Sequence, residues 1–511
     1  MIRRNVSHFS ESFYIFAEGL LIFFDMIDIQ VRIHDQYSVE FKIGYVIQEK
    51  GKENEFMMNT WFFVPYSLDI NASTYSKQNF YKDVKSNIRL ITPIFSLKEI
   101  AESEATPFVF LGNAFDKLVA DVNAETSSEY EYQLKMFASM LKSALREEVS
   151  HIVFNPVVED RQYLLECYLT HVGQITERYR NLRRKINVVT VPKNAISYFF
   201  FCDEYISNLV EFHTFRLLDR LKEQDPDCRE RMKERLMALI RSEIRYKRER
   251  GYMVVEKNSP ENNRTLIYRR GILKKFAESE LFLGASKKRD GVWVEQVYYS
   301  LAAGLSMIFA TIVTFYFQQE FGNFTMPLFV ALVISYMLKD RIKDLMRYYF
   351  AHRLSRRYFD HKTTISIKNN PIGWIKEGCD FISEDRVPEE VMKRRARSDL
   401  LEAENRMSKE GIILYRKLVR IDPEALLQNN RYETTGVNDI MRFNVEDFLE
   451  KMDSHEYELD MLEEGDNCGI VVGEKIYYIN FLMQFQHEGT VNYRRFRLVL
   501  TRNGIHSIRE L

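Results

Sequence analysis

Residues 298–317 read YYSLAAGLSMIFATIVTFYF, twenty amino acids without an Asp, Glu, Lys, Arg or His. As an α-helix this run is about 30 Å long, which equals the hydrocarbon thickness of a lipid bilayer. A second uncharged run, FTMPLFVALVISYML at residues 324–338, follows closely and is about 22 Å long as a helix. The two runs predict a transmembrane helical hairpin at residues 296–338, in which the second span is shorter than a bilayer usually requires.

Basic residues flank both runs and predict the orientation of the hairpin. The positive-inside rule places Lys- and Arg-rich segments in the cytoplasm, and the connection 318–323 contains neither residue type. Residues 339–362 are a predicted basic juxtamembrane helix whose cations contact anionic lipids. These cations are Lys339, Arg341, Lys343, Arg347, Arg353, Arg356 and Arg357. Both chain termini are then cytoplasmic.

Two alternatives to a two-pass hairpin stay open. A pair of apolar helices also forms the core of some soluble proteins, although core helices seldom need twenty uncharged residues. The shorter second run is alternatively a re-entrant segment that enters and leaves the bilayer on one side.

Small side chains recur at every fourth position of the first run, at Ala302, Ser306, Ala310 and Thr314. This spacing places them on one helix face, where a second helix can approach closely. The second run is the predicted partner of this transmembrane packing face. A second copy of the chain, which would make a homo-oligomer, is the alternative.

The N-terminal half of the chain predicts two cytoplasmic domains. Apolar and polar residues alternate at 27–33 and 39–45, which predicts a strand hairpin within a β-rich domain at 1–113. Helical spacing of apolar residues, with few internal breaks, predicts a helical bundle at 114–290.

The C-terminal part predicts a third cytoplasmic domain of mixed type at 363–511. A charged helix is expected at 387–410, and strands at 474–486 and 491–501 form a predicted antiparallel hairpin. With 511 residues and these segments, the chain is predicted to be an α+β membrane protein.

Motifs for catalysis are few, so no catalytic residue, cofactor or metal site is predicted. The chain has no G-x-x-x-x-G-K-[S/T], G-x-G-x-x-G, H-E-x-x-H or G-x-S-x-G motif. The single pair Glu148 and His151 falls short of the ligand set of a di-iron bundle. Asp203 and Glu204 are interpreted as acids at the start of a helix, where the helix dipole favours them.

The charge balance and the cysteines exclude further classes. The net charge is −1 and gives no indication of nucleic-acid binding. The five cysteines include no Cys-x-x-Cys pair, so they are interpreted as reduced cytoplasmic thiols.

Three segments carry a resemblance to other sequences: NTWFFVP at 59–65, YRRGILKKF at 268–276 and FVALVISYMLKDRIKD at 329–344. They are similar to a group of uncharacterised bacterial two-pass membrane proteins with large cytoplasmic domains. The resemblance implies a place in the bacterial inner membrane and brings no activity with it.

The preferred functional hypothesis is a membrane-anchored cytoplasmic scaffold, sensor or assembly protein. Its expected partners are the lipid bilayer, with anionic lipids, and an unidentified cytoplasmic protein. One alternative is a membrane-tethered enzyme whose site is assembled between domains. A channel or transporter subunit is a further alternative, which the absence of charged residues from both runs disfavours.

Overall fold

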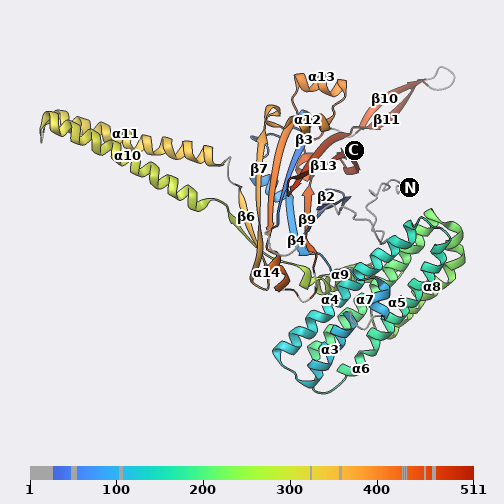
Figure 1. Cartoon of the computed structure of the whole chain (residues 1–511). Helices are drawn as coiled ribbons and strands as arrows, with labels where there is room; N and C mark the ends of the chain where they lie inside the picture. Colours follow the sequence, from blue (N-terminus) through green and yellow to red (C-terminus); the bar gives the residue numbers. More distant parts are fainter. Residues whose placement is uncertain are drawn as a thin grey trace.

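The computed structural model consists of a β-sheet body, a helical bundle and a long helical hairpin that projects from the body (Figure 1). The α+β class predicted from the sequence is confirmed. The structure describes residues 27–47, 54–102, 107–322, 325–355, 359–428, 430, 432, 434–453, 456–462 and 468–511.

The larger sheet of the body has eight antiparallel strands in the order β14-β13-β12-β3-β8-β7-β6-β5. Its strands are β3 (Asn54–Val64), β5 (Gly284–Arg289), β6 (His361–Ile367), β7 (Asn370–Ile382), β8 (Gly411–Ile421), β12 (Tyr477–His487), β13 (Thr490–Thr501) and β14 (Gly504–Glu510). The predicted C-terminal hairpin is β12–β13. Its turn is only Glu488–Gly489, and both residues have the positive φ that a two-residue hairpin turn requires.

The smaller sheet of the body has the order β1-β2-β9-β4 and packs against the larger one. Its strands are β1 (Ile27–Ile33), β2 (Ser38–Val46), β4 (Val84–Leu90) and β9 (Gly436–Asn444). The predicted strand hairpin is confirmed as β1–β2, with Ile33 opposite Val39. Aromatic rings from both sheets fill the space between them, because alternate residues of each strand point inward. Phe41 contacts Phe481 with ring centroids 5.5 Å apart, and Phe62 lies 5.3 Å from Phe443.

Both sheets combine strands from the two ends of the chain, which corrects the predicted division into domains 1–113 and 363–511. β3 pairs with β8 on one side and β12 on the other, and β9 lies between β2 and β4. Each terminal segment alone leaves strand edges and an apolar face uncovered, so the two segments form one body.

The helical bundle predicted at 114–290 begins earlier and ends earlier than predicted. It contains α2 (Leu97–Glu102), α3 (Pro107–Ala120), α4 (Ala124–Phe154), α5 (Asp160–Asn181), α6 (Arg183–Ile186), α7 (Lys193–Gln224), α8 (Pro226–Glu249) and α9 (Pro260–Ala277). Asp225 ends α7 and caps α8 by accepting a hydrogen bond from the Cys228 amide, with Pro226 in the first turn. Residues 284–289, also assigned to the bundle, are instead edge strand β5.

Asp203 and Glu204 lie in the middle of α7, and this corrects their predicted place at the start of a helix. The helix begins at Lys193, directly after Pro192, so the aromatic run before Asp203 is already helical. The helix dipole therefore does not account for these two acids.

The charged helix expected at 387–410 is divided into α12 (Glu389–Arg395) and α13 (Asp399–Met407). The break lies at Ala396, which has a left-handed φ of 44°. Arg397 follows it and binds the carboxylates of Glu384 and Glu410, each at 2.9 Å. These ion pairs stabilise the bend that a single helix would remove.

Shorter elements complete the description. They are α1 (Lys77–Asp83), α14 (Pro423–Gln428), α15 (Glu446–Leu449) and the two-stranded ribbon β10 (Glu456–Leu462) and β11 (Cys468–Glu474). The ribbon projects from the end of the body opposite the bundle (Figure 1).

Candidate functional site

The candidate site is the helical hairpin formed by α10 (Val292–Phe321) and α11 (Met326–Ser355). Strands β5 and β6 pair antiparallel as far as Arg289 and His361. α10 begins three residues after Arg289, and α11 ends at Ser355, six residues before His361. Each helix has 30 residues and is therefore about 45 Å long. The hairpin stands clear of the body from its root to its tip (Figure 1).

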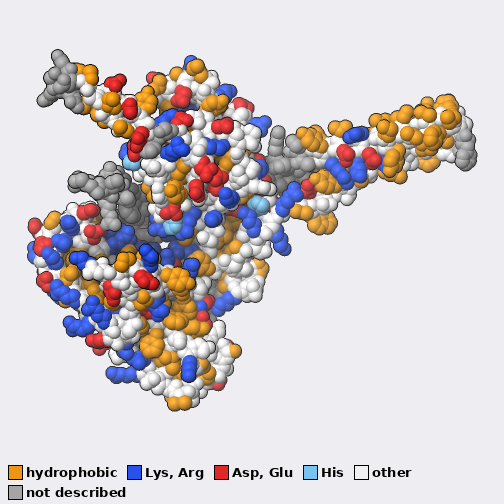
Figure 2. All heavy atoms as spheres, turned by 180° about the vertical axis from the view of Figure 1, so that it is seen from behind, with side chains coloured by type: hydrophobic (Ala, Val, Ile, Leu, Met, Phe, Trp, Pro, Cys, Tyr) orange, Lys and Arg blue, Asp and Glu red, His pale blue; other side chains and the backbone are white. Residues whose placement is uncertain are grey.

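Large apolar side chains cover the outside of both helices. Figure 2 shows them over the outer part of the hairpin, with charged side chains gathered nearer the body. Those at least half exposed include Leu301, Met307, Ile308, Ile312, Phe315 and Tyr316 on α10, and Met326, Phe329, Ile334, Tyr336 and Met337 on α11. In water such a surface is strongly unfavourable, because soluble monomers rarely expose apolar patches of this extent.

The two helices differ in how well they suit a bilayer. Among the described residues, α10 is the one helix that is long and apolar enough to cross a membrane. The second helix of the predicted hairpin does not meet this test. Its apolar part ends at Leu338, and Lys339, Asp340 and Arg341 follow within the same unbroken helix. The predicted basic juxtamembrane helix 339–362 is the second half of α11 as far as Ser355, and its last two residues belong to strand β6.

Contacts between the helices fix their register. The Ser335 hydroxyl donates to the Ala310 carbonyl at 3.5 Å, and the Arg347 guanidinium lies 5.5 Å from the Tyr299 ring centroid. Both helices rise by the same distance per residue and run in opposite directions. Lys339, four residues after Ser335, therefore lies level with Ser306, four residues before Ala310. The inner half of the uncharged α10 run thus faces the charged half of α11. The belt that is uncharged on both helices comprises residues 307–317 and 326–338, and is about 17–20 Å thick.

The predicted packing face of α10 is turned towards α11. Ala302 and Ser306 are buried, and Ser335 of α11 is buried level with Ala310. Ala310 and Thr314 are half-buried, and the Thr314 hydroxyl bonds to the Ala310 carbonyl of its own helix. Small side chains let two helices approach closely, which accounts for this arrangement.

The predicted lipid-contacting cations occupy the inner half of α11. The Lys339 ammonium lies 4.0 Å from the Tyr336 ring centroid, and Arg341 is exposed. Lys343 and Arg347 are half-buried. The side chain of Arg353 and residues Arg356 and Arg357 lie outside the described part of the chain. Exposed aromatic residues Tyr348 and Tyr349 directly follow Arg347, and this mixture of cations and aromatic rings is typical of membrane interfaces.

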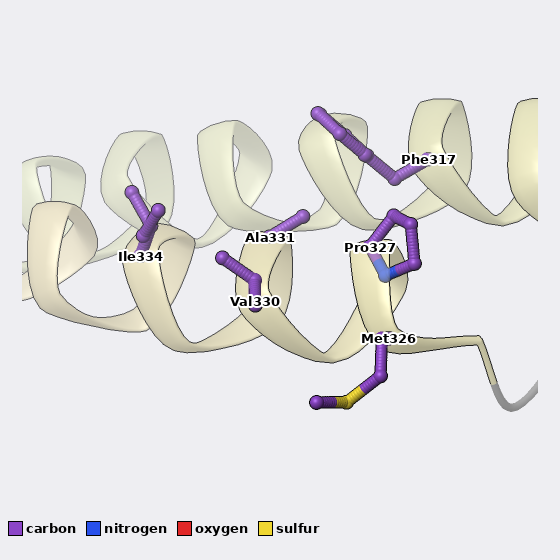
Figure 3. A pocket seen from close by; sticks show the side chains of 6 residues that line it. All are labelled: Phe317, Met326, Pro327, Val330, Ala331 and Ile334. Carbon is purple, nitrogen blue, oxygen red and sulfur yellow. The ribbon is translucent and has the colours of Figure 1, made fainter.

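A shallow apolar groove of about 450 Å³ runs between the helices near the tip of the hairpin. Phe317 of α10 forms one side, and the lining residues of α11 are Met326, Pro327, Val330, Ala331 and Ile334 (Figure 3). Among the described residues, no charged or hydrogen-bonding side chain lines it. The groove therefore suits hydrocarbon and offers no means to orient a polar substrate.

Trp293 was missed in the sequence analysis. It is 83% exposed at the root of α10, one turn before the uncharged run. Tryptophan is enriched at the boundary between lipid and water, so its position relative to the run was the signal that could have identified it.

The other acidic candidates are bound in structural interactions of the bundle. Asp203 accepts hydrogen bonds from Tyr246 at 2.7 Å and Tyr252 at 2.9 Å, and Glu204 binds Arg269 at 2.6 Å. Burial raises the pKa of the Asp203 carboxyl, while the two tyrosine hydrogen bonds act in the opposite direction. In the parts of the chain that the structure covers, no three His, Cys, Asp or Glu residues are grouped to hold a metal ion.

Comparisons with known protein families, curated proteins and solved structures found no match to this chain. The functional argument therefore rests on the hairpin and the body that carries it.

Proposed function

We propose that this protein is a membrane-anchored scaffold, sensor or assembly protein, and that the α10–α11 hairpin is its anchor. One observation carries the proposal: two long helices expose apolar side chains outward while standing clear of the body. Burying such side chains in hydrocarbon contributes about 25 cal/mol per Å². A lipid bilayer is the solvent that matches this surface.

The register of the helices supports a membrane boundary at Lys339–Lys343 on α11, level with Ala302–Ser306 on α10. The shared uncharged belt, about 17–20 Å thick, is thinner than the usual 30 Å of hydrocarbon. Lysine and arginine side chains that extend to the headgroups, together with local thinning of the bilayer, make up the difference. Gln318, Gln319 and Glu320 at the tip favour a complete crossing, because polar groups are unfavourable inside hydrocarbon.

This boundary leaves the root of the hairpin outside the hydrocarbon. The first ten residues of α10, 292–301, then form a stalk about 15 Å long between the bilayer and the sheets. Tyr299 lies in this stalk within the interfacial zone, and Trp293 lies at its far end, about 14 Å from Ala302 along the helix axis. The sequence alone placed the membrane boundary near residue 298, about one to two helical turns closer to the body.

The proposed orientation places the body and both ends of the chain in the cytoplasm, following the basic residues on that side. The bacterial inner membrane is the proposed location, as the sequence resemblance implies. The scaffold role is proposed because the body presents the bundle and the β10–β11 ribbon at opposite ends. Both are available to protein partners beside the membrane.

Labelling of single cysteines tests the anchor. Cys202, Cys228 and Cys379 are buried, so only Cys167 and Cys468 need replacement by serine in the background variant. We expect Asp344→Cys to react with a membrane-impermeant maleimide on the body side and Gln319→Cys on the opposite side. Ile308→Cys is expected to react only after detergent is added.

Each labelling outcome is informative. Reaction of Ile308→Cys in intact vesicles as fast as Asp344→Cys would remove the anchor hypothesis. Reaction of Gln319→Cys on the same side as Asp344→Cys would establish the re-entrant alternative.

A matched deletion provides the control. The Asp290 amide donates to the Asp360 carbonyl at 3.3 Å, so an Asn-Gly turn in place of residues 291–359 can close β5 and β6 as a hairpin. We expect this variant to stay in solution without detergent and not to float with vesicles. Flotation of the variant would mean that another part of the chain binds the membrane.

A further inference from the structure

The outer face of the larger sheet carries a row of three lysines at the root of the hairpin. Lys288 of β5 lies directly opposite Lys362 of β6, and Lys362 lies directly opposite Lys376 of β7. Residues directly opposite share a face of the sheet with their Cβ atoms about 5 Å apart, and like charges in such pairs are destabilising. We call these three residues the lysine row.

Opposite charges face each other in two other charged rows of the protein. In the smaller sheet, Arg32, Glu40 and Arg442 lie opposite one another on three strands. Glu40 accepts hydrogen bonds from Arg32 at 2.8 Å and Arg442 at 2.9 Å. In the larger sheet, Glu377 lies opposite Lys417 with their charged groups 3.3 Å apart. Like charges also meet in single pairs, as at Lys85 opposite Arg442 and Arg497 opposite Arg509. The lysine row differs from these pairs because it places three cations side by side on three adjacent strands.

The lysine row is only partly neutralised. Lys376 pairs with Asp290 at 3.0 Å. Lys288 and Lys362 have no carboxylate within ion-pair distance among the residues that the structure describes. Lysine on an edge strand protects against strand addition, which accounts for Lys288 on β5. It does not account for Lys362 and Lys376, whose strands lie inside the sheet.

An indole ring lies beside the lysine row. Trp374 of β7 lies two residues before Lys376, so both side chains are on the same outer face. Trp374 is directly opposite Arg420 of β8. The ammonium groups of Lys362 and Lys376 each lie 5.3 Å from its ring centroid, and the Arg420 guanidinium lies 5.9 Å away. Three cations thus surround one half-buried aromatic ring, with Lys288 beyond Lys362.

We propose that the lysine row, with Arg420 and Trp374, binds a phosphate-bearing ligand. A phosphate group offers several strong acceptors and up to two negative charges, so it offsets the repulsion of the row while accepting charge-assisted hydrogen bonds. The indole supplies an apolar floor beside the cations. The ligand is either a lipid headgroup or a soluble phosphate compound. The site lies on the sheet and does not depend on whether the hairpin crosses a bilayer.

The central variant is Lys362→Glu, which gives this row the alternating pattern of Arg32, Glu40 and Arg442. The protein is titrated with pyrophosphate at constant ionic strength while Trp374 fluorescence is followed. Trp293→Phe removes the exposed tryptophan of the hairpin, and Trp61 is buried. The matched control is Lys85→Glu, an equal charge change at an exposed position of β4 in the other sheet.

We expect a saturable change of Trp374 fluorescence in the parent protein and in Lys85→Glu. Lys362→Glu is expected to bind at least about tenfold more weakly. Without ligand, Lys362→Glu is expected to raise the midpoint of thermal unfolding by about 1–2 °C, because it removes like-charge contacts.

A second arm identifies the source of the phosphate. The same fluorescence is recorded with vesicles of phosphatidylcholine alone and with added phosphatidylglycerol. A response to pyrophosphate that Lys362→Glu weakens establishes the site for soluble phosphate compounds. A response confined to phosphatidylglycerol vesicles, and lost in Lys362→Glu, establishes a headgroup site. The proposal is overturned if neither probe changes the signal, if Lys362→Glu responds like the parent, or if Lys362→Glu lowers the unfolding midpoint.

Discussion

Helices α7 and α10 have nearly the same length, 32 and 30 residues, and opposite relations to their surroundings. α7 lies within the bundle and buries Asp203, Glu204 and Glu211. α10 lies outside the body and exposes apolar residues such as Ile312 and Phe315. α7 thus buries polar side chains, whereas α10 exposes apolar ones.

The difference follows from the partners available to each helix. Every one of the buried acids of α7 meets a cation or a hydroxyl donor from a neighbouring helix: Glu211, for example, binds Lys247 and also Arg270, the latter at 3.2 Å. A buried charge is tolerated when it is paired and hydrogen-bonded. Within the described part of the chain, the exposed apolar side chains of α10 such as Ile312 and Phe315 have no such partner, so an apolar solvent is the environment that would bury them. The following predictions test this contrast from the largest expected effect to the smallest.

The largest effect is expected from Lys247→Ala in the bundle. The Lys247 side chain is fully buried and bonds to Glu211 and, at 3.2 Å, to Asn208. Its removal leaves a buried carboxylate with only Arg270, so the free energy of unfolding should fall by about 3–5 kcal/mol. The measurement is chemical denaturation of the full chain in detergent micelles, followed by circular dichroism.

The control for this change is Lys233→Ala, because Lys233 pairs with Glu230 at the exposed surface of α8. It should change the unfolding free energy by less than about 1 kcal/mol. Equal effects of the two substitutions would mean that the buried ion pairs of α7 do not distinguish it from a surface helix.

Ile312→Lys in α10 is expected to act on membrane affinity. This position is 62% exposed and lies in the middle of the proposed hydrocarbon belt. A lysine there should weaken partition into vesicles by about 3 kcal/mol, roughly a hundredfold, without changing the unfolding of the bundle. Vesicle flotation measures the partition.

The comparison residue is Ile267, which is 72% exposed on α9 of the bundle. Ile267→Lys should leave flotation unchanged, since this side chain already faces water. If both variants lose flotation equally, net charge accounts for the result and the apolar surface of α10 does not.

An intermediate effect is expected from pH through His213 on α7. Burial lowers its pKa to about 4, and Lys142, Arg146, Arg216 and Arg220 act in the same direction. The His213 imidazole binds a proton near pH 6.5 in the unfolded chain, and only near pH 4 in the folded chain. The folded state is therefore not penalised by His213 above pH 6.5. As the pH falls towards 4, the free energy of unfolding decreases by about 2–3 kcal/mol.

His213→Gln should flatten the dependence of unfolding free energy on pH between 6.5 and 4. His506→Gln on strand β14, where the side chain is exposed, should leave the dependence as in the parent protein. An unchanged slope in His213→Gln would exclude a buried neutral histidine. α10 has no acidic, basic or histidine residue between Glu295 and Glu320, so its membrane binding should not follow this titration.

The smallest effect is expected from Ser335→Ala in the hairpin. Its hydroxyl makes a long bond of 3.5 Å to the Ala310 carbonyl, so the loss should stay below about 1 kcal/mol. Ser207→Ala in α7 removes a buried bond of 2.6 Å to the Glu243 carboxylate and should cost about 1–3 kcal/mol. Hydrogen exchange of the α10 and α7 amides measures the loss of stability in each variant. A larger loss in Ser335→Ala than in Ser207→Ala would contradict the proposed difference between the two helices.

Local patterns in the sequence predicted part of this fold. The alternation at 27–33 and 39–45 and the strand patterns at 474–486 and 491–501 each involve neighbouring segments, and both hairpins were predicted correctly. The uncharged run 298–317 likewise identified α10. Such signals need only the chain on either side of them.

Long-range relations were beyond the sequence. Nothing in β3 indicates that its neighbours are β8 and β12, because any antiparallel partner with an apolar face would satisfy its alternation. The charged half of α11 was visible as residues 339–347, but only the contact between Ser335 and Ala310 places it level with the apolar half of α10. The lysine row is likewise a product of strand register. Lys288, Lys362 and Lys376 are unremarkable surface lysines when read in order along the chain.

The position of β3 between β8 and β12 also bears on how the protein is synthesised. β3 leaves the ribosome before both of its neighbours in the sheet. Residues 65–410 are synthesised before β8, the earlier of the two neighbours, begins. The hairpin emerges during that interval and, as an anchor, would enter the bilayer while the body is still unfinished. The nascent chain would then be tethered at the membrane with β5 and β6 held together at the root. Such a tether would shorten the effective loop that the late strands must close. Membrane insertion would then be an early step, and completion of the sheet the last one.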